Sequence, residues 1–288
     1  MGLTSLALIL GSACIHVVTH VALKLSKDRT AFVWWMLLWS GVLFLPILLL
    51  GWQPIPPLGW GLMLLSSLFE AGYFLAIAKA YEGADLSLVY PLARGLGPAL
   101  LLVWSTTILR EHITAGGVVG VALIAVGLYA INLPRMGAWM EPLRAIGREG
   151  PRWALLAGTC ISLYTAVDKV GVGLVGPMLY VYLVILLGIV WLTPTTLWRV
   201  GWKGLRAEWQ YSRWLTVLAG FTTLAAYAIV LYAMRLGTPA SYAGSVREIS
   251  VVLGAAYGVF VLKENSGTTR LFGSALVAGG IGIIGLFG

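Results

Sequence analysis

The sequence predicts an all-α integral membrane protein with ten transmembrane helices, arranged as two inverted five-helix repeats. Hydrophobic residues make up 59% of the 288 residues, and charged residues only 10%. The mean hydropathy is +0.91, so a water-soluble fold would expose a very large apolar surface. Residues 74–131 and 227–284 also align without a gap at an offset of 153 residues, which indicates an internal duplication.

Apolar runs of roughly 20 residues, the length that crosses about 30 Å of hydrocarbon, recur along the whole chain. The first run opens without a basic segment and continues past Gly11 into more apolar sequence, so we expect a helix there and not a cleaved signal peptide. Short polar breaks separate the runs that follow. The ten expected helices cover residues 3–23, 31–51, 59–80, 86–108, 115–132, 152–172, 178–197, 214–234, 240–261 and 269–287.

The longest polar break, at residues 133–151, divides the ten helices into two sets of five. We therefore expect the first repeat at residues 1–132, a cytoplasmic linker at 133–151 and the second repeat at 152–288. The duplication supports this division, because identical residues recur at matching places in both halves. They include Arg94 and Arg247, Glu111 and Glu264, Gly120 and Gly273, and Gly127 and Gly280.

The formal net charge of +8 is spread unevenly over alternate loops. The loops after the odd-numbered helices hold fourteen basic residues, whereas the opposite loops hold only Arg110 and Arg235. Basic loops favour the cytoplasmic side, so this bias places both termini outside, and a nucleic-acid-binding protein would not show it. The fourteen are Lys24, Lys27, Arg29, Lys79, Arg135, Arg144, Arg148, Arg152, Arg199, Lys203, Arg206, Arg213, Lys263 and Arg270.

The sequence indicates no enzyme active site, cofactor or metal centre. Cys14 and Cys160 both lie inside predicted helices, which does not support a disulfide framework. His16 and His20 share one helix face, but no HExxH glutamate accompanies them, so a metal site is not expected. Both histidines are instead candidates for substrate binding or for proton relay, with ordinary helix-packing hydrogen bonds as the alternative.

Two arginines are predicted to lie deep in the bilayer, and they lead the candidates for substrate binding. Arg94 is about eight residues into its helix, roughly 12 Å deep at 1.5 Å per residue, and Arg247 occupies the equivalent place. A guanidinium group binds a carboxylate or phosphate through paired hydrogen bonds. Alternatively, each arginine is neutralised by an acidic neighbour such as Glu70 or Glu248 and braces the helices. The two roles are compatible if an ion pair opens during transport.

Three intramembrane carboxylates are candidates for coupling transport to protons. Glu70, Asp168 and Glu248 lie where an unpaired charge is expensive, so each could accept a proton. Asp168 directly precedes Lys169, and either residue could pair with a neighbouring helix instead. Glu248 follows Arg247 and, at about 100° per residue, points to a different face.

Three tyrosines near the charged residues complete the set of candidates for substrate binding, and two further glutamates are expected to have a structural role. Tyr73, Tyr90 and Tyr164 are candidates for substrate binding, because charged or kinked neighbours place them near the polar centre. Glu111 and Glu264 follow matching helices of the two repeats. We expect them to bind free amides at the start of the next helix, outside the transport site.

Several motifs around these residues resemble those of one family. The run DLSLVYPLARG at residues 85–95 is similar to the first repeat of the EamA family, in the drug/metabolite transporter (DMT) superfamily. The runs YTAVDKVG at 164–171 and VREISV at 246–251 resemble helices 6 and 9 of that family. Residues 16–29 further resemble a subgroup associated with phosphonate-utilisation genes.

This resemblance implies a secondary carrier of the bacterial cytoplasmic (inner) membrane, with a central cavity and alternating access. We expect it to move a small organic anion or zwitterion, such as an amino-acid-like or phosphonate-like metabolite, coupled to protons. A flippase for an anionic lipid or lipid-linked sugar headgroup is the alternative, using the same arginines. The expected partners are the substrate and membrane lipids, with no nucleic acid. We expect a monomer, and a homodimer through glycine-rich helices stays open.

Overall fold

The structure is a computed structural model, which describes residues 1–83, 86–131, 133, 135–253 and 267–288. The side chains of residues 81, 83, 86–88, 90 and 91 also lie outside the described part. Every regular element among the described residues is a helix, which confirms the predicted all-α class. The helices are α1 (Leu3–Leu25), α2 (Arg29–Leu43), α3 (Leu45–Leu50), α4 (Pro57–Gly83), α5 (Leu86–Thr107), α6 (Ala115–Ile131), α7 (Glu141–Arg144), α8 (Glu149–Leu174), α9 (Pro177–Arg199), α10 (Gly201–Arg235), α11 (Ala240–Val246) and α13 (Thr268–Phe287).

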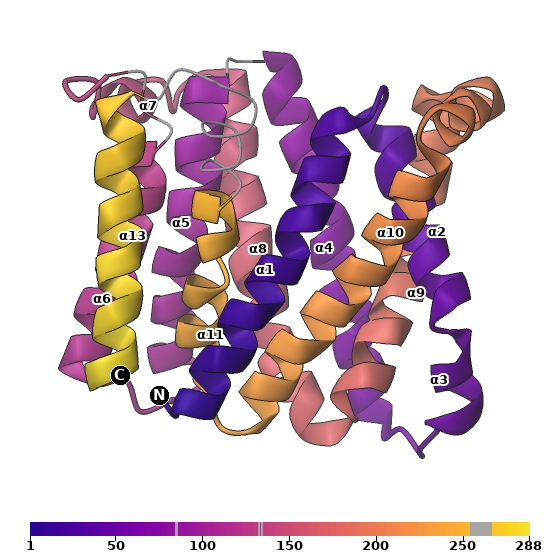
Figure 1. The fold of residues 1–288 in the computed structure, drawn as a ribbon, viewed down its shortest axis with the longest axis horizontal. Helices are drawn as coiled ribbons and strands as arrows, with labels where there is room; N and C mark the ends of the chain where they lie inside the picture. Colours follow the sequence, from indigo (N-terminus) through magenta and orange to yellow (C-terminus); the bar gives the residue numbers. More distant parts are fainter. Residues whose placement is uncertain (84–85, 132, 134, 254–266) are drawn as a thin grey trace.

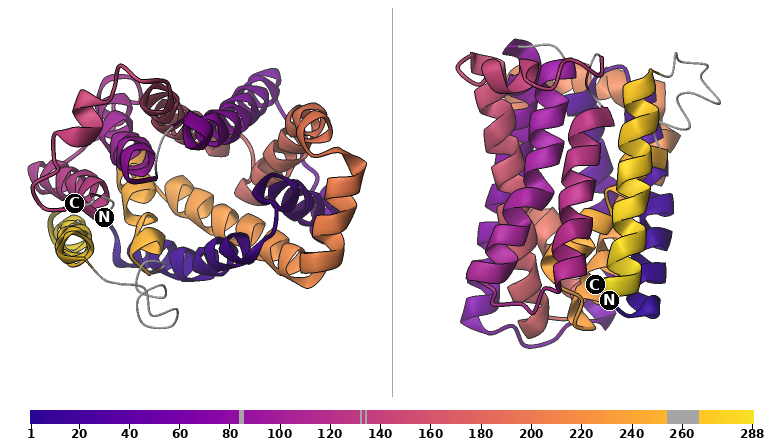
Figure 2. Two further views of the ribbon diagram at one scale, coloured as in Figure 1. Left: turned by 90° about the horizontal axis from the view of Figure 1, so that it is seen from above. Right: turned by 90° about the vertical axis from the view of Figure 1, so that its left-hand side faces the viewer.

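The long helices stand side by side, with both chain termini at one end and α7 at the opposite end (Figure 1). The side view in Figure 2 shows the same arrangement. The amino group of Met1 donates a hydrogen bond to the carbonyl oxygen of Gly288, so the two ends of the chain are in contact. The termini therefore lie on the same face of the bundle, as an even number of membrane crossings requires.

Apolar helices long enough to cross a membrane form most of the bundle. Within the described residues, six meet this description: α1, α8, α9, α10, α13 and the part of α4 at Pro57–Ala80. Helix α6 is apolar but shorter. The multi-pass membrane class is thus confirmed, whereas the number of ten crossings stays a prediction.

Two predicted helices have different limits in the structure. The run at 31–51 is divided into α2 and α3 at Phe44. Pro46 lies in the first turn of α3, where its ring would clash with the carbonyl of Val42 if the helix were continuous. The run at 214–234 belongs to the longer α10, which begins at Gly201 and has non-helical backbone angles at Ser212.

The predicted continuous helix at 240–261 is wrong. Helix α11 ends at Val246, Arg247 and Glu248 form a turn, and residues 249–253 are helical again. The turn is tight, since the amides of Glu248, Ser250 and Val251 each bond a carbonyl three residues earlier. Residues 254–261 lie outside the described part of the chain.

Elements of the two predicted halves interleave in the bundle. Helices α4 and α5 pack against α8, and α1 and α2 pack against α10. Helix α11 packs mainly against α5. Polar residues of α4, α5, α8, α10 and α11 can therefore meet inside the bundle.

Glycines bring α6 and α13 into close reciprocal contact. A Cβ atom at Gly120 would lie 2.7 Å from the carbonyl oxygen of Gly280, and one at Gly280 would lie 2.6 Å from that of Gly120. Gly127 and Gly273 have the same reciprocal relation, at 2.7 and 2.6 Å. Because the earlier glycine of one helix meets the later glycine of the other, the helices are antiparallel. Inverted repeats produce this arrangement, in which only glycine leaves room for the facing backbone.

We predict that Gly127→Ala lowers the thermal stability of the protein. The added methyl would lie 2.7 Å from the carbonyl oxygen of Gly273, so α6 and α13 must separate. Overpacking of this kind costs about 1–3 kcal/mol. The measurement is thermal unfolding of the purified protein in detergent.

Gly279→Ala is the matched control, because a Cβ atom there meets no neighbouring atom within 4 Å. Both substitutions replace a helical glycine with alanine and so raise helix propensity by the same amount. The difference between the two melting temperatures therefore reports the contact made at Gly127. Equal melting temperatures would show that α6 and α13 do not pack through Gly127.

Candidate functional site

The two predicted arginines lie inside the bundle, one from each half. Nη1 of Arg94, on α5, lies 3.1 Å from Oε2 and 3.3 Å from Oε1 of Glu248. Glu248 belongs to the turn that follows α11, and its side chain is only 6% exposed. Arg94 is therefore neutralised by an acidic neighbour, which is one of the two roles that the sequence left open.

Arg247, the preceding residue of that turn, has a different partner. Its Nη2 donates a hydrogen bond of 3.0 Å to the hydroxyl of Tyr164 on α8. Its Nε lies 3.9 Å from Oε1 of Glu248, which is beyond hydrogen-bond distance. Glu248 thus mainly balances Arg94, and Arg247 faces Tyr164.

The two histidines of α1 lie near this pair of arginines. Their ring centroids are 4.6 Å apart in an edge-on arrangement, and both side chains are half-buried. His16 lies within electrostatic reach of Arg94 and Arg247, and His20 of His16 and Arg94. The structure thus brings both predicted histidines to the arginine cluster.

Glu70 and Tyr73 reach the same region from α4. Glu70 lies within electrostatic reach of Arg247 and Asp168. Tyr73 lies within electrostatic reach of Tyr164. Glu70 and Tyr73 are half-buried, so they retain accessible surface within the bundle. The side chain of Tyr90 lies outside the described part, and its predicted role stays a prediction.

Asp168 is fully buried on α8 and accepts hydrogen bonds from three hydroxyl groups. Ser66 of α4 and Tyr180 of α9 donate to Oδ1 at 2.5 and 3.0 Å. Tyr227 of α10 donates to Oδ2. This carboxylate therefore links four helices. The sequence analysis missed its three donors, because single hydroxyls in apolar helices form no recognisable motif.

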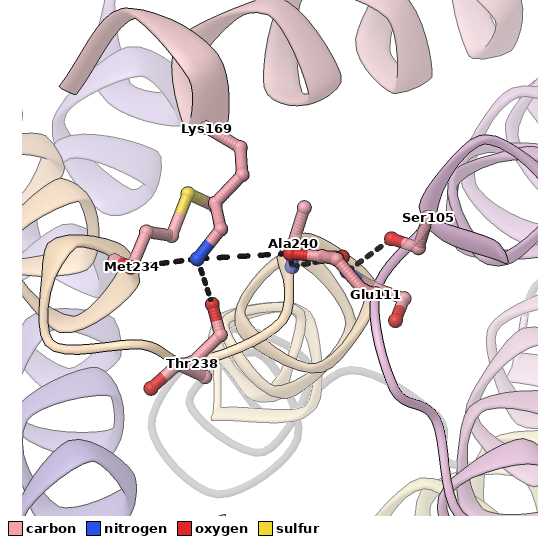
Figure 3. Close-up of polar contacts among 7 residues, drawn as sticks. Ser105, Glu111, Lys169, Met234, Thr238 and Ala240 are labelled. Carbon is pink, nitrogen blue, oxygen red and sulfur yellow. Dashed lines mark hydrogen bonds and ion pairs between the residues drawn. The ribbon is translucent and has the colours of Figure 1, made fainter. Parts of the chain in front are cut away.

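Lys169, the next residue of α8, points to the junction between α10 and α11 (Figure 3). Its Nζ donates to the carbonyl oxygens of Met234 at 2.7 Å and Thr238 at 2.8 Å. It also lies 3.6 Å from Oε1 of Glu111. Lys169 thus binds two carbonyls at the junction of α10 and α11, and one of them, that of Met234, also accepts the amide of Gly237.

Glu111 completes this junction from the loop after α5. Its carboxylate accepts the amide of Ala240 at 3.0 and 2.9 Å, at the first residue of α11. Ser105 accepts the next amide, that of Ser241, at 3.0 Å. The expectation that Glu111 binds the start of the next helix is therefore wrong. A positive φ of 52° at Arg110 turns the loop back, and the amide of Glu111 bonds the carbonyl of Ser105.

The fold and the apolar helices define a multi-pass, all-helical integral membrane protein. The model of the EamA-like transporter family matches residues 3–133 and 149–286. The chain therefore belongs to the EamA-like transporter family, as its motifs suggested. Membership places it in a family of transporters.

Comparison with solved structures supports the same fold. A chain titled "Crystal structure of protein" aligns with a TM-score of 0.73 and 16% sequence identity, covering 98% of this chain and 96% of that one. In all, 28 solved chains match. Comparison with curated proteins gives no match. At this identity the likeness establishes the architecture alone, and the phosphonate-associated subgroup stays a prediction.

We predict that Glu111→Ala destabilises the protein more than Glu111→Gln. Glutamine keeps an oxygen for the amide of Ala240 and loses only the charge. Alanine leaves that amide without its acceptor and Lys169 without its acidic partner, so that Lys169 keeps only the carbonyls of Met234 and Thr238. Losing a buried acceptor costs roughly 1–3 kcal/mol. Thermal unfolding in detergent measures the difference.

Arg135 and Glu141 form an ion pair that is 77% and 44% exposed, and it provides the control. Exposed pairs contribute about 0–1 kcal/mol, so Glu141→Ala should have little effect. If Glu111→Ala were no more destabilising than Glu141→Ala, the junction would not depend on Glu111.

Proposed function

We propose that the protein is a secondary active transporter that moves a small organic anion or zwitterion across the cytoplasmic membrane by alternating access. The arrangement of Arg247 supports this most directly. Glu248 accepts hydrogen bonds from Arg94, whereas Arg247 donates to the neutral hydroxyl of Tyr164 and lies 3.9 Å from Glu248. An arginine inside a membrane is expensive unless it is paired, so a carboxylate or phosphonate of the substrate is a suitable partner.

The interrupted helix supports a binding site at the same place. Transporter sites are commonly formed where a membrane helix is discontinuous, because the turn frees polar groups at the protein interior. The turn at Arg247 and Glu248 is such a discontinuity. Helix breaks of this kind are tolerated only where protein or a water-filled cavity surrounds them.

Glu70 and Asp168 are the proposed proton carriers. Both lie inside the bundle, and Glu70 is within electrostatic reach of Arg247. Asp168, on α8, contacts three other helices through its hydroxyl donors, so exchange of a proton there is coupled to how these helices pack. Glu248 acts with Arg94 as an ion pair that can open when the substrate binds.

The junction of Lys169 and Glu111 is proposed as the contact that closes one side of the carrier. It joins the loop after α5 to the start of α11, at the end of the bundle that holds the termini (Figures 1 and 3). From the distribution of basic residues we propose that this end lies outside. Opening towards the outside would then require these contacts to separate.

We predict that Arg247→Gln strongly reduces substrate-induced stabilisation without unfolding the protein. The test is a thermal shift of the purified protein with amino acids, phosphonates, sugar phosphates and soluble lipid headgroups. A ligand at 100 times its Kd adds about 2.7 kcal/mol of stability. Loss of hydrogen bonds to a charged group should weaken binding by about 10- to 100-fold. Arg247→Lys should recover only part of the ligand affinity, because lysine keeps the positive charge but lacks the planar guanidinium group that forms paired hydrogen bonds.

Arg144→Gln, an exposed site on α7, is the matched control and should bind like the wild type. If folded Arg247→Gln bound every ligand as the wild type does, Arg247 would be a structural brace. If lipid headgroups were the sole ligands, the protein would be a flippase.

A further inference from the structure

We propose that the first part of α10, residues 201–214, is a docking surface for the headgroups of anionic phospholipids. Such a surface is independent of the substrate and of the transport mechanism. Three features of this segment support it: the direction of its helix, the contacts that hold it against α2, and the side chains that it exposes.

Helix α10 is longer than a membrane crossing requires. It contains 35 residues, which span about 52 Å at 1.5 Å per residue, whereas the hydrocarbon core is about 30 Å thick. Residues 213–235 alone would span about 34 Å. The backbone leaves helical geometry at Ser212, with φ of −129° and ψ of 24°. The part before Ser212 lies across the end of the bundle that also holds α7 (Figures 1 and 2), as a helix at a membrane surface does.

The inward side of this segment is fixed against α2. Leu205 is fully buried, and its carbonyl oxygen accepts a hydrogen bond of 2.9 Å from Nε1 of Trp35. The ring of Trp209 packs against those of Trp35 and Trp39, with centroids 4.8 and 5.4 Å apart. These contacts give the opposite side of the segment a fixed orientation towards its surroundings.

Glu208, the one acidic residue among residues 201–214, is also turned inward and is 1% exposed. Its Oε2 accepts the amide of Asp28, just before α2, at 2.8 Å. Its Oε1 accepts the hydroxyl of Ser212. The carboxylate is therefore occupied within the protein, and it does not neutralise the basic side chains of the outward side.

The outward side carries three basic and three aromatic side chains. None of the basic ones forms an ion pair with a residue that the structure describes. At about 100° per residue, Trp202, Arg206 and Lys203 lie within about one third of the helix circumference. The guanidinium carbon of Arg213 lies 5.6 Å from the ring centroid of Trp214. The six exposed residues are Trp202, Lys203, Arg206, Tyr211, Arg213 and Trp214.

This combination suits the headgroup layer of a membrane that contains anionic lipids. Tryptophan and tyrosine rings prefer that layer, because they have an apolar body and a polar N–H or O–H group. A lysine or arginine near an anionic surface strengthens binding about fivefold. Phosphatidylcholine has no net charge, so it should gain from the rings but not from the basic residues.

The linker at the same end of the bundle lacks this combination. Its tryptophan, Trp139, is half-buried, and the ring packs against that of Tyr129 with centroids 5.9 Å apart. Arg144 and Arg148 are exposed, but no exposed tryptophan or tyrosine accompanies them among the described residues 135–148. The positive-inside rule accounts for basic residues in both places, yet it depends on their number and not on their arrangement with aromatic rings.

The test measures how tightly lipids bind to the full-length protein in detergent. The probes are phosphatidylglycerol, which is anionic, and phosphatidylcholine with the same acyl chains, and native mass spectrometry over a lipid titration gives each Kd. In the wild type, phosphatidylglycerol should bind about 10- to 100-fold more tightly than phosphatidylcholine, because three charges contribute. In Lys203→Gln/Arg206→Gln, phosphatidylglycerol should bind about 25-fold more weakly, while the Kd for phosphatidylcholine stays unchanged.

Arg144→Gln/Arg148→Gln is the matched control, because it removes the same charge from the same end of the bundle. Its Kd for phosphatidylglycerol should stay within about threefold of the wild-type value, since no exposed aromatic rings flank these arginines. Equal losses in the two double variants would show that net charge alone attracts the lipid, and would overturn the proposal. A wild-type protein without a preference for phosphatidylglycerol would also overturn it, as would a folded Lys203→Gln/Arg206→Gln protein that keeps the preference.

Discussion

The ion pair between Arg94 and Glu248 joins α5 to the turn that interrupts the helix after α11. Both side chains are largely buried, so removing either would leave an uncompensated charge inside the bundle. The pair therefore holds the turn against α5. Because Arg247 is the preceding residue of the turn, this contact also fixes where its guanidinium group lies. The position of the candidate substrate site thus depends on a contact that is itself structural.

Charged residues that are adjacent in the chain serve different parts of the molecule. Asp168 and Lys169 lie about 100° apart around α8. Asp168 consequently meets hydroxyl groups of α4, α9 and α10, whereas Lys169 reaches the junction of α10 and α11. That junction needs polar partners because non-helical backbone inside a membrane must be satisfied by the protein itself. Glu111 supplies the partner for the amide that begins α11. A charge of the first half, that of Glu111, therefore helps to stabilise a break in the second half.

Hydropathy predicted the helical membrane class, because apolar runs of membrane-spanning length recur along the chain. The meeting of α6 with α13 was not predicted. The break at Arg247 could not be predicted, since the apolar run continues on both sides of it. The partner of Glu111 was missed because sequence spacing reports local neighbours, and α11 is more than a hundred residues away. Pro46 did mark the end of α2, and it could have been recognised. The sequence also identified Arg94, Glu248 and Asp168, but it could not say which partner each would find.

The duplication explains why the two arginines of this site are not equivalent. Arg94 and Arg247 occupy aligned positions, but Gly95 follows the first and Glu248 follows the second. A Cβ atom at Gly95 would lie 3.2 Å from the carbonyl oxygen of Ala125, so close packing of α5 on α6 disfavours a larger residue there. The first repeat therefore has no acid beside its arginine, and the acid of the second repeat pairs across to Arg94. A duplicated architecture in this way holds two arginines with different partners, one bonded to Glu248 and the other to Tyr164.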